Sequence, residues 1–293
     1  MQSKEISMKN KKILTSITQS LLLSTGLLLS LSAGLAIGYV GGLVKDQPVL
    51  TQKEMKEQIN NISKNSEVYF GSGEKLGTIN SELIRKTVSY EELGDNVKNA
   101  IIASEDSNFY SNSGVDIFAV IRASLSEVTG EKTTGGSTIT QQLVKNQLLD
   151  NSRSYERKAK EILLALRVDS HFSKNEILEN YLNVASFGKN SLGQNISGIE
   201  TAAQGVFGVH SKDLNIAQAA YLIGFVQSPY RYTPFDSAGN IRPDEELQTG
   251  FERQQYVLER MLSNEFITKE QFEEAKKFDI KGAYTKQKYS EYT

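Results

Sequence analysis

The amino-terminal 44 residues constrain the fold more than any other segment. An uncharged stretch runs from residue 13 to residue 44, and its centre, from residue 21 onward, is rich in leucine. This centre is longer than the ~7–15 apolar residues of a signal-peptide core, and about 20 residues are enough to cross a bilayer. The sequence therefore predicts a transmembrane helix over 13–44. A cleaved signal peptide is the alternative, because residues 32–34 are small.

The charges that flank this stretch predict its orientation. Four lysines precede it, at positions Lys4, Lys9, Lys11 and Lys12. The positive-inside rule then places residues 1–12 in the cytoplasm as a short tail. Everything from residue 45 onward is expected on the outer face of the cell membrane.

Composition excludes several classes of function. The 293 residues carry a net charge of −2, which argues against a nucleic-acid binder. The chain has no cysteine, so disulfides, thiolate chemistry and cysteine-ligated zinc are excluded. His171 and His210 are the only histidines, too few to favour a catalytic triad or a multi-histidine metal site.

Hydrophobic periodicity predicts that the part of the chain from residue 45 onward is mainly helical. Residues 45–65 are polar and predict a membrane-proximal helix or stalk, and two β-prone runs within 67–79 predict a hairpin. Little else indicates a sheet. The period predicts helices at 96–104, 115–128, 137–149, 153–170, 174–184, 197–207 and 213–226, with two more within 250–278. We expect one domain over 66–249, followed by a helical linker over 250–293.

A pair of carboxylates marks the first candidate site. Glu105 and Asp106 follow an apolar helix and precede Phe109 and Tyr110. Beside two aromatic rings Glu105 would be poorly hydrated, and a desolvated carboxylate is a better base. The alternative is that the pair only caps a helix end.

A glycine-rich turn opens the second candidate site, GGSTITQQLVKN at 135–146. Backbone N–H groups at the start of such a helix suit an anion such as a diphosphate. Gln142, Lys145 and Asn146 lie at i, i+3 and i+4, so they share one face that suits phosphates or sugar hydroxyls. An ordinary capped helix with a solvated face is the alternative.

Two further segments place charged groups at helical spacing. Arg157 and Lys158 each lie one turn before Glu161. Two cations with one carboxylate could hold a diphosphate, directly or through a divalent ion, although a surface ion-pair helix is the alternative. In 174–183, Glu179 and Asn183 lie four residues apart, away from the apolar stripe, and we expect them to brace the site.

The order and spacing of these segments resemble glycosyltransferase family 51, the glycosyltransferase module of class A penicillin-binding proteins and of monofunctional peptidoglycan glycosyltransferases. The resemblance covers residues 66–280. It rests on EDSNFY at 105–110, GGSTITQQLVKN at 135–146, RKAKE at 157–161, KNEILENYLN at 174–183, GIETAAQGVFG at 198–208 and AQAAYLIG at 217–224. It implies a mainly α-helical, lysozyme-like fold in two lobes, of which the smaller, matched by residues 115–130, dips into the membrane surface.

The resemblance also implies an activity on the outer face of a bacterial cell membrane. The enzyme would add lipid II to a glycan carried on undecaprenyl pyrophosphate, with inversion to a β-1,4 link. Glu105 matches the general base and Glu161 the carboxylate that assists the leaving group. The residues matched to substrate binding are Asp106, Phe109, Ser137, Thr138, Gln142, Lys145, Asn146, Arg157, Lys158, Glu179 and Asn183. No cofactor is obligatory, but Mg²⁺ or Mn²⁺ on the pyrophosphate is compatible; cell-wall synthesis proteins are candidate partners, and moenomycin-type phosphoglycolipids are expected to block the cleft.

Three further expectations qualify the resemblance. Asn112 stands two residues before Gly114, where the family usually has a histidine, so donor positioning is where this chain would differ. No Lys-Thr-Gly motif is present, so we expect no transpeptidase domain and favour a truncated class A protein over a monofunctional one. A lysozyme-like hydrolase and a non-catalytic wall scaffold are the competing functions. The cations at 145, 157 and 158 argue against the first, and the retained glutamates against the second.

Overall fold

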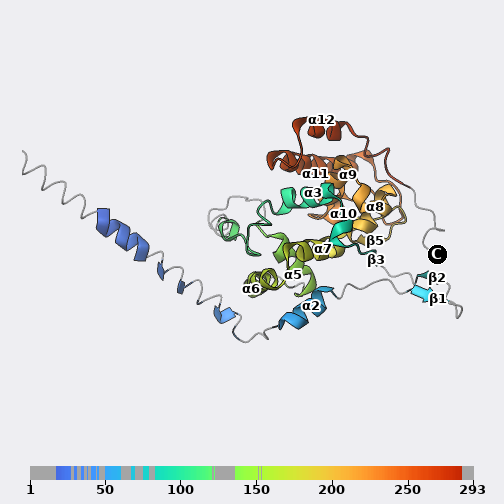
Figure 1. Cartoon of the computed structure of the whole chain (residues 1–293). Coiled ribbons are helices and arrows are strands. Elements are labelled where there is room, and N and C mark those ends of the chain that lie inside the picture. The colour runs from blue at the N-terminus through green and yellow to red at the C-terminus, as the bar shows by residue number, and fades with distance from the viewer. Residues whose placement is uncertain are drawn as a thin grey trace, which may run out of the picture. The chain divides into compact units, whose positions relative to one another are not determined.

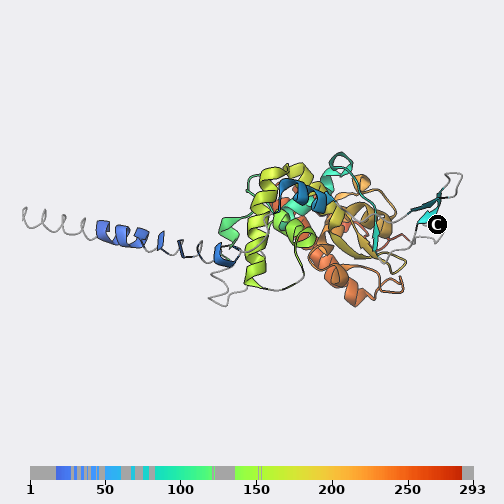
Figure 2. The same cartoon turned by 90° about the horizontal axis from the view of Figure 1, so that it is seen from below.

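The computed structural model describes residues 18–27, 50–60, 67–69, 75–78, 83–120, 122, 136–150, 152 and 154–285, with scattered positions between 30 and 45 (Figures 1 and 2). The chain divides into two compact units. One unit is Met1–Val49 with Ser152–Lys160, and the other is Leu50–Asn151 with Glu161–Thr293.

The first unit contains an apolar helical segment over residues 18–27. Its leucines are exposed, among them Leu21 and Leu27. Among the described residues, no helix combines the length and the hydropathy that crossing a membrane requires. The tail at 1–12 and much of the span expected at 13–44 lie outside the described residues, so both stay predictions.

Helices make up most of the second unit, which confirms the mainly helical fold class (Figure 1). Several begin with a side chain that accepts a backbone N–H, as Thr138, Ser173, Asn215 and Thr268 do. The helices are α2 (Gln52–Asn60), α3 (Asp95–Glu105), α5 (Ile139–Gln147), α6 (Tyr155–His171, which begins in the first unit), α7 (Lys174–Val184), α8 (Ile199–Phe207), α9 (Ile216–Phe225), α10 (Pro229–Tyr232), α11 (Asp244–Ser263) and α12 (Lys269–Lys277). Short 3₁₀ turns lie at η1 (Tyr90–Glu92) and η2 (Ser211–Asp213).

The core of the second unit forms around α9, which is buried over nearly all of its length because almost every residue in it is apolar. Both α3 and α11 pack against α9 and against each other, as the neighbouring green, orange and red helices show in Figure 1. A second pair is formed by α5 and α7. Glu105 is the last residue of α3, and Thr138 caps the amino end of α5.

The strands confirm one prediction and contradict another. β1 (Glu67–Tyr69) and β2 (Lys75–Thr78) pair antiparallel, as the predicted hairpin requires. The expectation of no further sheet is wrong, because β3 (Leu83–Arg85), β5 (Asn195–Ser197) and β4 (Ser186–Lys189) form a second sheet in that order. β3 pairs parallel with β5, although more than one hundred residues separate them in sequence. No local sequence pattern predicts such a pairing.

Two predicted boundaries differ from the structure. The segment expected as a membrane-proximal helix or stalk contains the helix α2, whose Met55 and Ile59 are fully buried in the core of the second unit. The boundary expected between residues 249 and 250 falls inside α11, whose Val257 and Met261 are also fully buried. Both helices therefore belong to the folded domain, because their apolar stripes pack against it.

Candidate active site

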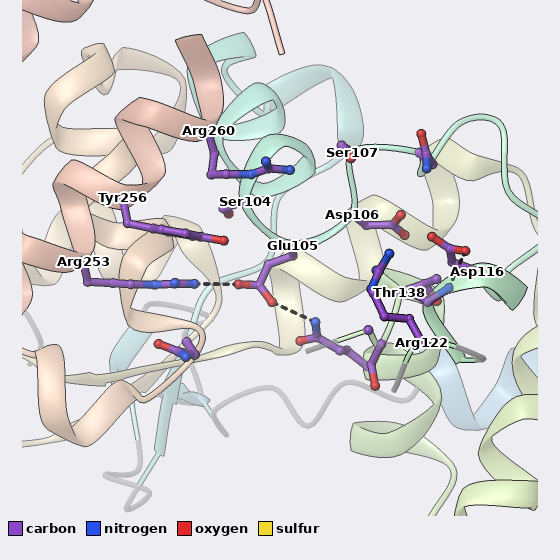
Figure 3. Close-up of a pocket in the computed structure, with 16 residues that line it drawn as sticks. Ser104, Glu105, Asp106, Ser107, Asp116, Arg122, Thr138, Arg253, Tyr256 and Arg260 are labelled. Carbon is purple, nitrogen blue, oxygen red and sulfur yellow. Dashed lines mark hydrogen bonds and ion pairs between the residues drawn. The ribbon is translucent and has the colours of Figure 1, made fainter. Parts of the chain in front are cut away.

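A cavity of about 500 Å³ opens at the carboxyl end of α3 in the second unit (Figure 3). Five parts of the chain meet around it: the end of α3 with the loop that follows, the segment that carries Asp116 and Arg122, the start of α5, the turn after α9, and α11. The lining residues are Ser104, Glu105, Asp106, Ser107, Asn108, Asp116, Ala119, Arg122, Gly136, Ser137, Thr138, Gln142, Gln227, Arg253, Tyr256 and Arg260.

Glu105 lies at the centre of this cavity, between two helices that come from opposite sides. It is the last residue of α3, whose apolar face is anchored in the core. Its Oε2 accepts a hydrogen bond of 2.9 Å from Nε2 of Gln142 on α5. Its Oε1 lies 3.0 Å from Nη2 of Arg253 on α11, and Figure 3 shows these two side chains pointing toward one another. The carboxylate is therefore fixed at both oxygens.

The surroundings of Glu105 differ from the expected aromatic pocket. Phe109 is fully buried, packs edge-to-face on Tyr110 at 5.2 Å and lies beneath the ammonium of Lys174 at 4.9 Å. It belongs to the core and is not among the residues that line the cavity, so its contact with substrate stays a prediction. Polar groups from α5 and α11 surround the carboxylate instead.

Asp106 is directed at the amino end of α5. It is 7 % exposed, and its Oδ2 accepts the backbone N–H of Ile139 at 3.1 Å. Burial raises the pKa of the Asp106 carboxyl, and the hydrogen bonds from Ile139 and Asn112 offset part of that effect.

The amino end of α5, where the sequence predicts a diphosphate, holds the chain's own carboxylate of Asp106 in this structure. The neighbouring amides of Thr138 and Gln141 are also engaged, by the side chains of Gln141 and Thr138 respectively. These amides are therefore not available to a diphosphate in this structure.

Asn112 ties the loop after α3 together. Its Nδ2 donates to both carboxylate oxygens of Asp106, at 2.9 and 3.1 Å. Its Oδ1 accepts from the N–H of Gly114 at 2.9 Å and from Nζ of Lys174 at 3.2 Å. The position where the family usually has a histidine thus holds an amide that organises the loop.

Glu161 lies close to α5 but does not line the cavity. It is 3 % exposed, and its Oε1 accepts a hydrogen bond of 3.2 Å from Nε2 of Gln141. Gln141 and Gln142 are adjacent, so two consecutive residues of α5 reach the two predicted catalytic carboxylates. The structure therefore connects Glu105 and Glu161 through α5, whereas only Glu105 faces the cavity.

The other predicted residues fall into separate places. Ser137 and Thr138 line the cavity, and Thr138 also begins α5. Lys145 and Asn146 are exposed on the last turn of α5 and are not among the lining residues. Arg157 and Lys158 belong to the first unit, so their part in a phosphate site stays a prediction.

Glu179 and Asn183 brace the segment before α3. Glu179 accepts the N–H of Tyr90 at 2.9 Å. Asn183 accepts the N–H of Val88 at 3.0 Å and donates to its carbonyl at 2.8 Å. Neither side chain lines the cavity, and their contacts are with Val88 and Tyr90, so the role expected for them at the site stays a prediction.

α11 contributes three of the cavity residues that the sequence analysis missed. Arg253, Tyr256 and Arg260 lie at i, i+3 and i+7, so they share one face of the helix. The guanidinium of Arg253 stacks 4.4 Å from the ring centroid of Tyr256, and Nε of Arg260 donates to the carbonyl of Ala103 at 3.1 Å. This spacing is visible in the sequence, but the helical pattern there predicts a linker and not a part of the site.

The charges of the cavity suit a base beside an anionic substrate. Three arginines line it, and two of the three carboxylates are engaged by the backbone, Asp106 at Ile139 and Asp116 at Ala119. Glu105 is the carboxylate held only by side chains, which leaves its remaining lone pairs directed at the cavity. Among the residues that the structure describes, no group of three or more histidine or acidic side chains is placed to hold a metal ion.

Comparison with known proteins agrees with this geometry. The transglycosylase family model matches residues 72–262. Penicillin-binding protein 1A of Aquifex aeolicus is 40% identical over 230 residues, which cover 78% of this chain and 30% of that protein. Penicillin-binding protein 1A of Clostridium perfringens is 36% identical over 255 residues, 85% of this chain and 36% of that protein. Penicillin-binding protein 2a of Streptococcus pneumoniae is 35% identical over 255 residues, 87% of this chain and 32% of that protein.

These relatives are longer proteins, and the chain spans about a third of their length. The crystal structure of penicillin-binding protein 1A from Haemophilus influenzae matches with a TM-score of 0.42 at 20% identity, covering 78% of this chain and 22% of that one. The family match spans most of the chain and includes every residue that lines the cavity. The chain therefore belongs to the transglycosylase family, glycosyltransferase family 51, as its motifs predicted.

Proposed function

We propose that the chain is a peptidoglycan glycosyltransferase and that the cavity around Glu105 is where lipid II is joined to a growing glycan strand. One observation carries the proposal. A carboxylate at the centre of a polar cavity is held at both oxygens, by Gln142 and Arg253, in a chain of the transglycosylase family. A fixed carboxylate facing a hydroxyl is the geometry that general-base catalysis requires.

The proposed reaction forms one bond and breaks one. Glu105 takes the proton from the 4-hydroxyl of the acceptor sugar while that oxygen attacks the anomeric carbon of the donor sugar. The bond between that carbon and the diphosphate oxygen breaks on the opposite face, so the new link is β-1,4 and undecaprenyl pyrophosphate leaves with the electron pair. Because a carboxylate has about four lone-pair sites, Glu105 can keep both hydrogen bonds while it receives the proton.

Cationic side chains stabilise the departing diphosphate in this proposal. Arg122 and Arg260 already line the cavity. Lys145, Arg157 and Lys158 are the further cations that the family resemblance assigns to this role. Glu161 would hold these cations, or a Mg²⁺ or Mn²⁺ ion brought by the diphosphate, and such an ion would neutralise developing charge on the leaving group.

Replacing Glu161 by Gln is expected to slow turnover about a hundredfold to a thousandfold, the range found when one electrostatic group is removed from an active site. The amide keeps an oxygen that can accept from Gln141, so the fold should remain. Glu156→Gln on the same helix, which weakens the half-exposed surface pair with Lys160 at 2.9 Å, is the matched control and should stay within about twofold. Consumption of lipid II with and without Mg²⁺ measures both; unchanged turnover in Glu161→Gln would remove this residue from the mechanism.

The chain would act at a membrane surface. The transmembrane helix expected at 13–44 is one contact with the membrane, and a second apolar contact lies beside the cavity. Ile117 and Phe118 are 65% and 80% exposed, between the lining residues Asp116 and Ala119. Large apolar side chains that remain in water next to a cavity for a lipid-linked substrate suit partial insertion into the bilayer.

A double variant, Ile117→Ser with Phe118→Ser, tests that contact. We expect KM for lipid II in vesicles to rise about tenfold or more, since burying each such side chain contributes about 1.5–3 kcal/mol. KM for a short-chain, water-soluble lipid II analogue should not change. Phe278→Ser, which removes an exposed aromatic from the segment after α12, serves as control. Equal rises of KM for both substrates would show that the two residues act on the site itself.

Incubation of the purified full-length protein with lipid II tests the proposed function. We expect glycan polymer that lysozyme degrades, together with released undecaprenyl pyrophosphate. A lysozyme-like hydrolase would instead produce reducing ends from finished glycan without a lipid carrier. A non-catalytic scaffold would leave both substrates unchanged.

A further inference from the structure

A buried tyrosine reaches Glu105 through Gln142. The hydroxyl of Tyr181, on α7, donates to Oε1 of Gln142 at 2.8 Å. The amide of the same Gln142 side chain donates to Oε2 of Glu105 at 2.9 Å. Tyr181 is fully buried and lies outside the cavity lining, so it can touch neither substrate nor reacting atoms.

The chemistry of the three groups allows only one direction of hydrogen bonding. An ionised carboxylate can only accept, so Gln142 must present its NH₂ group to Glu105. Its carbonyl oxygen then faces Tyr181, whose hydroxyl must donate. Burial raises the pKa of Tyr181 well above its ordinary value, and the charge of Glu105 adds to the effect, so the hydroxyl keeps its proton.

We propose that Tyr181 is a positioning residue that fixes the orientation of the Gln142 amide and, through it, the carboxylate of Glu105. This inference rests on the proposed function of the cavity. Without the hydroxyl, the Gln142 amide can rotate and turn its carbonyl toward Glu105, where two acceptors repel each other. Arg253 alone would then hold Glu105, by a single contact of 3.0 Å.

The arrangement spans three helices, which is why it can hold the base accurately. Glu105 ends α3, Gln142 belongs to α5, and Tyr181 belongs to α7, which packs against α5. The buried contact between α5 and α7 therefore fixes the orientation of the Gln142 side chain, and Gln142 in turn fixes the carboxylate of Glu105 in the cavity. Small displacements of a reacting group lower rates strongly, because the bound geometry must be close to that of the transition state.

Tyr181→Phe removes only the hydroxyl and is the decisive variant. We expect kcat for lipid II polymerisation to fall about tenfold with little change in KM, which corresponds to about 1.4 kcal/mol of transition-state stabilisation. Tyr221→Phe is the matched control, since Tyr221 is also fully buried and its hydroxyl lies 2.6 Å from that of Tyr284. It should lose a similar amount of thermal stability while kcat stays within about twofold.

A double variant distinguishes a positioning role of Tyr181 from a general loss of stability. If Tyr181 acts through Gln142, adding Tyr181→Phe to Gln142→Leu should not lower kcat further, although each single variant does. Independent, multiplying losses in the double variant would overturn the proposal, as would an unchanged kcat in Tyr181→Phe. Wild-type protein is assayed in parallel: if it makes no polymer at all, it is the proposed function that fails. If the wild type is active and Tyr181→Phe matches Tyr221→Phe, only the positioning role fails.

Discussion

Replacing Glu105 by Gln is expected to lower the rate of lipid II polymerisation by at least about a hundredfold, because general-base catalysis typically contributes about 10²–10⁴. The amide has nearly the same shape as the carboxylate, and its oxygen can still accept from Gln142 or Arg253. It cannot take a proton from the acceptor hydroxyl. Thermal unfolding should therefore stay close to that of the wild type while turnover is lost.

The matched control for this variant is Glu259→Gln. Glu259 is an exposed carboxylate on α11 that accepts from Gln255 at 2.9 Å and does not line the cavity. Its replacement should leave turnover within about twofold, as surface substitutions usually have small effects. Polymer formed by Glu105→Gln at the wild-type rate would refute the assignment of Glu105 as the base.

Gly114→Ala is expected to lower the free energy of unfolding by about 3 kcal/mol or more. Gly114 has φ of 83°, and a Cβ atom there would lie 2.5 Å from the carbonyl oxygen of Ala165 and 2.8 Å from Cβ of Asp169. Neither Ala165 nor Asp169 can retreat easily, because both belong to α6. A loss of this size lowers the melting temperature of a domain this large by roughly 6–12 °C.

The same substitution should also disturb the geometry of the cavity. The carbonyl of Gly114 accepts from Oγ1 of Thr138 at 2.6 Å, and its N–H donates to Asn112 at 2.9 Å. Gly282→Ala is the control, since its added Cβ meets the movable carboxylate of Asp279 and its φ is not positive. Circular dichroism melts compare the two. Equal melting temperatures would mean that the turn at Gly114 adapts, and that the loop after α3 is less constrained than its contacts indicate.

Local patterns were enough to predict most helices. The bounds of α7 agree with the periodicity at 174–184, and α3, α5 and α8 differ from it by one or two residues at most of their ends. The reason is physical: an apolar stripe at helical spacing, begun by a capping side chain such as Ser173, fixes a helix without distant contacts. The hairpin β1–β2 was predictable for a similar reason, since its two strands are neighbours in sequence.

Features that depend on distant contacts were not predictable. Strands β3, β4 and β5 have only three or four residues each, too few for an alternating pattern to stand out. The occupation of the α5 amino end by Asp106 requires the loop after α3 to fold back, which no spacing reveals. The role of Arg253 depends on α11 packing beside α3, although 148 positions separate Arg253 from Glu105.

The stoichiometry of the reaction tests the account most directly. Purified protein is given lipid II labelled in the sugar and in the lipid, and new glycosidic bonds and released undecaprenyl pyrophosphate are counted in the same sample. If Glu105 deprotonates the acceptor while the diphosphate of the donor departs, each new β-linked bond must release one lipid diphosphate. Lipid diphosphate released without bond formation, or an α-configured link, would contradict the account.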